Sequence, residues 1–172
     1  LDFLPEGEGL SAKHLLKNSK KLIILKAFTK LYGMAGVRLG YCLCSDTELL
    51  ARMRAAGQPW AVSGLAQAAG IAALDETEYV AKVRALIEAQ RPVLADGLRA
   101  LGLRVIEGRA NYLLFRAPEA LGEALRRKGA VLRSCGNYPG LDASWYRTAV
   151  RTENENRQLL ALLAETLPEV AQ

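Results

Sequence analysis

Two short apolar runs, residues 21–25 and 39–44, flank the segment that most constrains this fold. Apolar runs of this length, bounded by glycine or polar residues, predict buried strands. The connection between them, K-A-F-T-K-L-Y-G-M-A-G-V-R, carries Lys30 and Arg38, and its glycines allow the backbone to approach a ligand closely. Two interpretations follow: solvated charges on a turn, or a nucleophilic lysine placed by a β-strand.

Helical patterns follow the second strand. Ser45 is predicted to cap a helix over residues 48–56, with Glu48 as its capping-box partner and Gly57 at its end. A second helix is predicted over residues 63–74, which are rich in alanine and glycine and almost without charge. This composition indicates a helix packed closely against its neighbours.

A long amphipathic helix begins at Asp75 and contains Pro92 near its middle. Before it, Ser11 is predicted to cap a short helix near the start of the chain. After it, the pattern predicts a separate α+β unit with strands at 103–106, 112–116, 130–133 and 146–150, and helices at 118–128 and 153–167. We therefore expect two domains, residues 1–95 and 96–172.

Composition argues against two classes of function. The net charge is +5, but the basic residues are spread over amphipathic helices, and aromatic residues make up only 6% of the chain. A nucleic-acid-binding protein would need a basic stripe with aromatic stacking platforms, so we expect no nucleic-acid partner. No apolar run approaches the roughly 18 residues that cross a bilayer, so we expect no membrane segment.

The cysteines and the histidine argue against a metal centre. Cys42, Cys44 and Cys135 are an odd number without a secretory signal, which is typical of a reduced, cytoplasmic protein. Cys42 and Cys44 would lie on one face of a strand, where free cysteine acts as a small core residue. Because His14 is the only histidine, neither a zinc site nor a histidine-dependent triad is expected.

Lysine chemistry fits the connection between the two strands. A nucleophilic lysine must lose its proton, and the ordinary lysine pKa of about 10.4 opposes this near neutral pH. Desolvation or a neighbouring cation favours the uncharged amine. Lys30 follows a buried strand, and Arg38, eight positions later, can fold back towards it. Arg38 also offers a fork of N–H donors suited to a phosphate group.

The segment A-F-T-K-L-Y-G-M-A-G-V-R-L-G resembles the lysine signature of fold-type I pyridoxal-phosphate enzymes, the class I/II aminotransferase superfamily. The resemblance implies that Lys30 holds pyridoxal 5'-phosphate as an internal aldimine and that Arg38 binds the cofactor phosphate. Thr29 keeps a hydroxyl at the cofactor site, whereas Ala27 stands where the family often has a phosphate-binding serine or threonine. The implied fold is α/β: the C-terminal part of the large domain followed by an α+β small domain.

Further stretches resemble the same superfamily. W-Y-R-T-A-V-R-T-E-N-E-N resembles the strand and helix that carry the arginine for the substrate α-carboxylate, which would be Arg147. A-N-Y-L-L-F-R and V-L-R-S-C-G-N-Y-P-G-L resemble the histidinol-phosphate aminotransferase and threonine-phosphate decarboxylase subgroup, and they make Arg133 a candidate for a substrate phosphate or carboxylate. Q-P-W-A-V-S and Arg151, where many aminotransferases have glycine, favour the decarboxylase.

The resemblance implies a cytoplasmic homodimer that acts on a small amino acid or phosphorylated amine. The reaction would be transamination, or decarboxylation of L-threonine O-3-phosphate in cobalamin biosynthesis. The resemblance covers only the C-terminal half of the usual length. We therefore expect a fragment that is inactive alone, with the aspartate at the pyridine nitrogen and the glycine-rich phosphate loop before Leu1. The alternative is a non-catalytic interaction module in which Lys30 is an ordinary turn residue.

Overall fold

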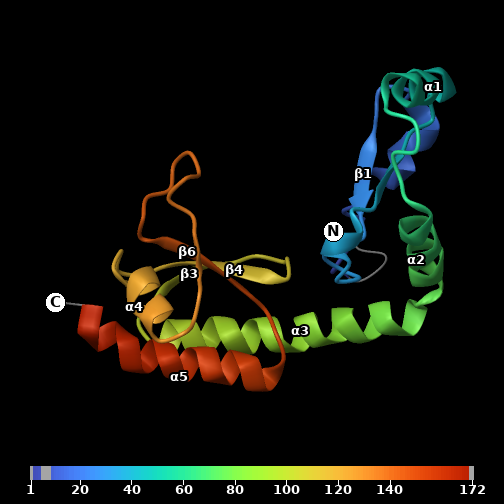
Figure 1. Cartoon of the computed structure of the whole chain (residues 1–172). Helices are drawn as coiled ribbons and strands as arrows, with labels where there is room; N and C mark the ends of the chain where they lie inside the picture. Colours follow the sequence, from blue (N-terminus) through green and yellow to red (C-terminus); the bar gives the residue numbers. More distant parts are fainter. Residues whose placement is uncertain (1, 5–8, 171–172) are drawn as a thin grey trace. The chain divides into compact units, whose positions relative to one another are not determined.

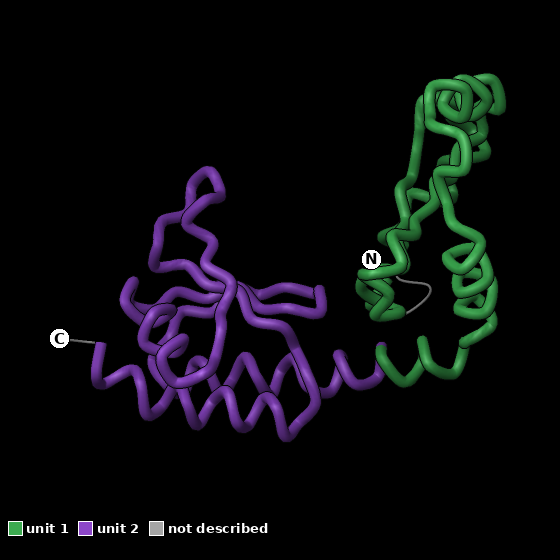
Figure 2. The backbone as a smooth tube through the Cα atoms, in the orientation of Figure 1, with its two compact units in different colours: residues 1–83 green, residues 84–172 purple. Residues whose placement is uncertain are grey.

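The computed structural model describes residues 2–4 and 9–170, which fall into two units, within residues 1–83 and 84–172 (Figure 2). The division lies inside α3 (Thr77–Ala100), the long helix expected after Asp75. The predicted domain boundary after residue 95 lies in the same helix and stays a prediction.

In the first unit, the two predicted strands form an antiparallel hairpin, β1 (Ile24–Ala27) and β2 (Gly40–Leu43). The predicted burial of these strands is wrong, because their residues are half-buried or exposed. A Cβ atom on Gly40 would lie 2.9 Å from the carbonyl oxygen of Lys26, so this close approach of the strands requires glycine. The connection between the strands contains a turn and a short 3₁₀ helix, η2 (Ala35–Val37).

The sequence predicts serine caps for two helices of the first unit, η1 (Ala12–Asn18) and α1 (Thr47–Ala56). Ser11 caps η1 as predicted. The predicted Ser45 cap of α1 is wrong, because Asp46 accepts a hydrogen bond from the Leu49 N–H at 2.9 Å. The hydroxyl of Ser45 instead donates to a carbonyl in the segment before β1. A carboxylate is also the better cap electrostatically, since a helix N-terminus attracts negative charge.

The next helix, α2 (Gly64–Asp75), begins at Ser63 and is packed on one side only. Its small residues are buried, namely Ala66, Gly70 and Ala73. Its large apolar residues are exposed instead, namely Leu65, Ile71 and Leu74. The close packing predicted from its composition therefore holds for one face.

The second unit is built on a four-stranded antiparallel sheet with the strand order β3-β4-β6-β5. Its elements after α3 are β3 (Arg104–Ile106), β4 (Tyr112–Arg116), α4 (Leu121–Arg127), β5 (Arg133–Ser134), β6 (Trp145–Ala149) and α5 (Glu153–Val170). Figure 1 shows α3 and α5 running side by side, and Gly97 of α3 lies against Leu160 of α5. No helix in the described ranges is long and apolar enough to cross a membrane.

One face of this sheet forms the core with the helices. Side chains at alternating strand positions are buried, among them Leu113, Phe115, Tyr146 and Thr148. The helices contribute leucines with 0% exposure, namely Leu94, Leu98, Leu121, Leu125 and Leu163. Because strand side chains alternate between faces, the intervening residues lie on the opposite face, and these include the candidate substrate arginines.

The strand predicted at residues 130–133 is shorter than expected. The backbone there ends α4: Gly129 adopts a φ of 83°, and the Ala130 N–H donates to the Leu125 carbonyl at 2.9 Å. The Ala130 N–H thus satisfies a carbonyl at the end of α4 and cannot form a hydrogen bond within the sheet. Pairing in β5 therefore includes only Arg133 and Ser134.

We predict that Leu163→Ala lowers the free energy of unfolding by about 2–5 kcal/mol, because it leaves a cavity at a fully buried site. Val93→Ala removes a side chain that is 54% exposed and serves as the control. It should change the free energy by no more than about 0.5 kcal/mol. Urea unfolding followed by circular dichroism measures both, and equal losses would contradict this assignment of the core.

Candidate functional site

Lys30 lies in a turn that directly follows β1. Its neighbours Phe28 and Leu31 are buried, with 4% and 6% exposure. The Phe28 N–H donates to the Leu39 carbonyl at 3.2 Å, and the Met34 N–H donates to the Phe28 carbonyl at 3.3 Å. Buried anchors and backbone hydrogen bonds thus fix a turn on which lysine is exposed.

Exposure of Lys30 differs from the expected desolvation. The described residues do not bury its amine, so they do not supply the low-dielectric surroundings that favour an uncharged lysine. Thr29, the preceding residue, is half-buried. The turn therefore presents the Lys30 side chain without enclosing it.

Arg38 ends η2 in the left-handed backbone conformation, with φ 57° and ψ 45°. For a residue other than glycine this conformation costs about 1–2 kcal/mol, so the surrounding structure must hold it. One guanidinium nitrogen of Arg38 donates to the Ala35 carbonyl at 3.1 Å, and the residue is exposed. The remaining N–H groups can therefore serve an anion such as phosphate.

In the second unit, the sheet register brings the two predicted substrate arginines together. Arg133 of β5 and Arg147 of β6 are direct partners across the antiparallel pair. Directly opposite residues share a face of the sheet, which here is the face opposite the core. Two arginines that are direct strand partners favour an anionic ligand, because like charges in this position otherwise destabilise the pair.

Arg151 has a partner of its own at the start of α5. Its Nε donates to a Glu155 carboxylate oxygen at 2.7 Å, and the same carboxylate accepts from the Thr152 hydroxyl at 2.6 Å. The Arg151 guanidinium, followed by Thr152, lowers the pKa of Glu155 to about 2. Arg151 therefore stabilises the first turn of α5 in this chain.

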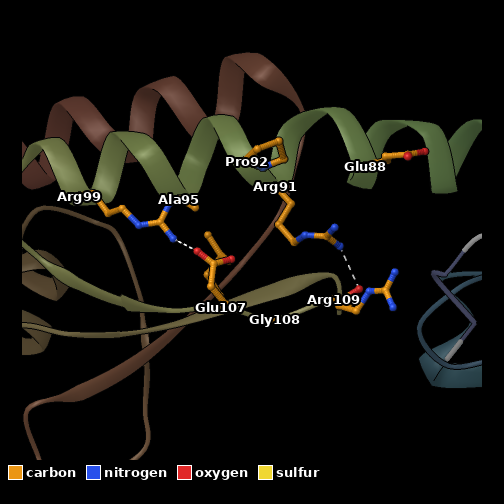
Figure 3. A pocket seen from close by; sticks show the side chains of 9 residues that line it. Glu88, Arg91, Pro92, Ala95, Arg99, Glu107, Gly108 and Arg109 are labelled. Carbon is orange, nitrogen blue, oxygen red and sulfur yellow. Dashed lines mark hydrogen bonds and ion pairs between the residues drawn. The ribbon is translucent and has the colours of Figure 1, made fainter. Parts of the chain in front are cut away.

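A cavity of about 540 Å³ lies between α3 and the β3–β4 connection (Figure 3). Its lining residues are Glu88, Arg91, Pro92, Ala95, Arg99, Glu107, Gly108, Arg109 and Leu113. Arg91 donates to the Arg109 carbonyl at 2.9 Å, and Arg99 pairs with Glu107. Arg133 and Arg147 are not among its lining residues. The cavity is thus separate from the candidate substrate arginines.

The cysteines are free thiols, with Cys42 and Cys44 half-buried and Cys135 buried. Within the described part of the chain, no group of three or more histidine, cysteine or acidic residues could hold a metal ion.

Comparison with known proteins identifies the family of the chain. Residues 2–163 match the family model described as aminotransferase class I and II. The chain belongs to this aminotransferase family. The chain is 37% identical to the threonine-phosphate decarboxylase of Salmonella typhimurium over 99% of its own length and 48% of the relative.

Solved structures of the family superimpose on the chain. The histidinol-phosphate aminotransferase of Clostridium acetobutylicum has a TM-score of 0.87 and 31% identity, over 92% of this chain and 49% of that protein. The histidinol-phosphate aminotransferase of Sinorhizobium meliloti, solved in complex with pyridoxal-5'-phosphate, has a TM-score of 0.71 and 25% identity, over 89% and 42%. This aminotransferase-family chain thus spans about half the length of the relatives that it matches. The expected α/β class is confirmed.

The described residues fit this family's cofactor. The exposed amine of Lys30 can form a bond with an aldehyde carbon, and Arg38 has free donors for a phosphate group. Arg38, Lys30 and Thr29 belong to the first unit, whereas Arg133 and Arg147 belong to the second. In the first unit, Thr29 and Lys30 lie on the turn after β1 and Arg38 lies at the end of η2, whereas the two arginines of the second unit lie on one strand pair.

Two aromatic residues near the arginines were missed by the sequence interpretation. The ring centroid of Tyr112 lies 4.7 Å from Cζ of Arg147, and that of Tyr138 lies 5.8 Å from Cζ of Arg133. The A-N-Y-L-L-F-R segment contains Tyr112 two residues before the strand position that pairs with Arg147. Only the pairing register reveals that contact.

We predict that Glu155→Gln weakens the pH dependence of stability in acid. The pKa of Glu155 in the folded chain, about 2, lies below its ordinary value of 4.5, so the ionised group stabilises the fold at neutral pH. That contribution is lost as the pH falls from about 4.5 to about 2. Urea midpoints between pH 2 and pH 6 should therefore fall less steeply in Glu155→Gln.

The control is Glu153→Gln, which removes a carboxylate from the same first turn of α5. It should keep the wild-type slope. An unchanged slope in Glu155→Gln would contradict the assigned role of this carboxylate.

Proposed function

We propose that the protein containing this chain is a pyridoxal-phosphate-dependent aminotransferase that acts on an amino acid or a phosphorylated amino compound. The observation that carries the proposal is the turn after β1, which presents Lys30 between the buried anchors Phe28 and Leu31 in a chain of this family. In this proposal Lys30 carries the cofactor, Arg38 binds its phosphate, and Thr29 contributes a hydroxyl to the cofactor site.

The cofactor, when bound, supplies an electron sink for negative charge at the substrate Cα. Lys30 would hold the cofactor, and its amine, once replaced there by the substrate amine, would carry the proton from the substrate Cα to the cofactor carbon C4′. Arg147 holds an acidic group of the substrate with its two-pronged guanidinium. Arg133, directly opposite it, offers a second anion contact.

Decarboxylation of L-threonine O-3-phosphate is the second candidate function. It is favoured by the 37% identity to a threonine-phosphate decarboxylase over 99% of the chain. That substrate carries a carboxylate and a phosphate, and the Arg133–Arg147 pair offers two guanidinium groups on one face. If these arginines bind the phosphate, the carboxylate is left free to depart, whereas a carboxylate held by Arg147 favours proton loss.

We predict that Lys30→Ala in the full-length protein lowers turnover by at least about 10³-fold, because the group that carries the cofactor and moves the proton is lost. Wild-type protein should also absorb visible light when loaded with cofactor and lose this absorption after borohydride treatment. The control is Lys20→Ala, an exposed lysine before β1, which should keep both properties. Near-normal turnover in Lys30→Ala would contradict the proposal, and a colourless protein would favour the interaction module.

The functional protein is proposed to be a cytoplasmic homodimer, and residues 1–172 alone are proposed to be inactive. Apolar residues on the first unit support a further expectation, since Leu65 is 85% exposed and Ile71 is 69% exposed. Ile71 also borders an apolar cavity of about 400 Å³ together with Phe28 and Tyr41. Such surface usually marks an interface.

We therefore predict that purified residues 1–172 associate at micromolar concentration. Ile71→Ser combined with Leu65→Ser should shift sedimentation towards the monomer, because it removes apolar surface from the interface. The matched control is Val131→Ser, since Val131 is 74% exposed but lies in the other unit. A monomeric wild-type chain that turned over an amino acid would contradict both the association and the inactivity.

A further inference from the structure

The pairing of Arg133 with Arg147 raises the question of what orients each guanidinium group. The two residues are direct partners across β5 and β6, so their side chains leave the backbone at adjacent positions on one face of the sheet. Like charges directly opposite each other destabilise a strand pair. Flexible arginines would therefore turn away from each other into solvent unless another group holds them.

Each of the two guanidinium groups lies over a tyrosine ring. Cζ of Arg147 is 4.7 Å from the Tyr112 centroid, and Cζ of Arg133 is 5.8 Å from the Tyr138 centroid. A cation within about 6 Å of an aromatic centroid is attracted by the ring face. Arg133 has additional support, because it donates to Oδ1 of Asn137 at 3.1 Å.

Arg147 depends more heavily on its ring. Across residues 2–4 and 9–170, its guanidinium makes no hydrogen bond and no ion pair, so the contact with Tyr112 is what orients it. Arg116, on the same sheet face, has polar contacts instead, since its Nε donates to the Ser144 hydroxyl at 2.8 Å. All five N–H donors of Arg147 consequently remain available for an acidic ligand.

The strand register places the Tyr112 ring where it can contact the guanidinium group of Arg147. Tyr112 of β4 is the direct partner of Ala149 on β6, and the next pair on that face is Leu114 with Arg147. The short side chain of Ala149 leaves space above the sheet, and an aromatic ring reaches diagonally to the neighbouring pair. The Val150 N–H donates to the Asn111 carbonyl at 2.9 Å and fixes the end of this strand pair.

We propose that Tyr112 is a positioning residue for Arg147. Its ring holds the guanidinium in place without using any of its donors, so that Arg147 faces an acidic substrate group in a preset orientation. This inference rests on the proposed role of Arg147 in substrate binding. It adds the requirement that residue 112 has an aromatic ring. The hydroxyl of Tyr112 is not needed for this role.

The test measures kcat and KM separately in the full-length enzyme, with L-threonine O-3-phosphate and L-histidinol phosphate as probes. Tyr112→Leu should raise KM about tenfold for the probe that the enzyme accepts, equivalent to about 1.4 kcal/mol, with kcat within about twofold of wild type. Tyr112→Phe keeps the ring and should stay within about twofold of wild type in both constants. A KM in Tyr112→Leu equal to that of wild type would overturn the proposal.

Combining substitutions separates positioning from general structural damage. In an Arg147→Ala background, Tyr112→Leu should cause little further rise in KM, because the cation that the ring orients is already gone. A full tenfold further rise would overturn the proposal. If Tyr112→Leu fails to fold, Tyr112→pentafluorophenylalanine retains the shape of a ring but removes its negative face, and it should raise KM as Tyr112→Leu would. A wild-type KM in that variant would also overturn the proposal.

Arg104→Leu is the matched control, because Cζ of Arg104 lies 5.7 Å from the centroid of the Trp145 ring on the same sheet face. It should leave KM unchanged, and an equal rise there would show a general loss of positive charge and overturn the positioning role. Arg147→Lys distinguishes the substrate-binding role of Arg147 from the positioning role of Tyr112. If Arg147→Lys leaves KM unchanged, the proposed role of Arg147 itself fails; if Arg147→Lys raises KM and Tyr112→Leu does not, only the positioning role fails.

Discussion

Burial of apolar side chains fixes the backbone beside Lys30 and beside Arg147. In the second unit, Leu113, Phe115 and Tyr146 pack one face of the sheet onto helices, with 0–2% exposure. Because strand side chains alternate, this burial forces Arg133 and Arg147 onto the other face. A slip of one residue in the register would exchange the two faces, so the same core that stabilises the unit determines where its arginines lie.

The first unit uses the same constraint on a smaller scale. Phe28 and Leu31 are buried on either side of Thr29 and Lys30, and the Phe28 ring packs 5.7 Å from that of Tyr41 on β2. The exposed amine is therefore attached to a fixed turn rather than to a freely moving loop. Arg38 shows the cost of this arrangement, since its left-handed backbone is held against its own preference.

Local sequence patterns predicted most of the elements, because each pattern is satisfied within a few residues. The strand at residues 112–116 and the start of the final helix at Glu153 agree with the structure. Errors arose where two local solutions compete. Ser45 and Asp46 can both cap a helix, and the backbone after Gly129 can extend a strand or end a helix.

The arginine pair and its tyrosine could not be found in the same way. Arg133 and Arg147 are far apart in the chain, and their adjacency depends on a register set by the whole sheet. Tyr112 can reach Arg147 because its own strand partner is Ala149, two residues further along β6. The family signature predicts roles for Lys30 and Arg38 from their spacing, but spacing carries no information on exposure. The described residues do not provide the expected desolvation of Lys30.

Peptide mapping of the full-length, cofactor-loaded protein after borohydride reduction tests the central claim most directly. The account predicts that the cofactor mass is found on the peptide that contains Lys30, at one equivalent per chain. Lys26, which lies on β1 and forms an ion pair with Asp2, should remain unmodified. Cofactor fixed to Lys26 or another lysine, with Lys30 unmodified, would contradict the account.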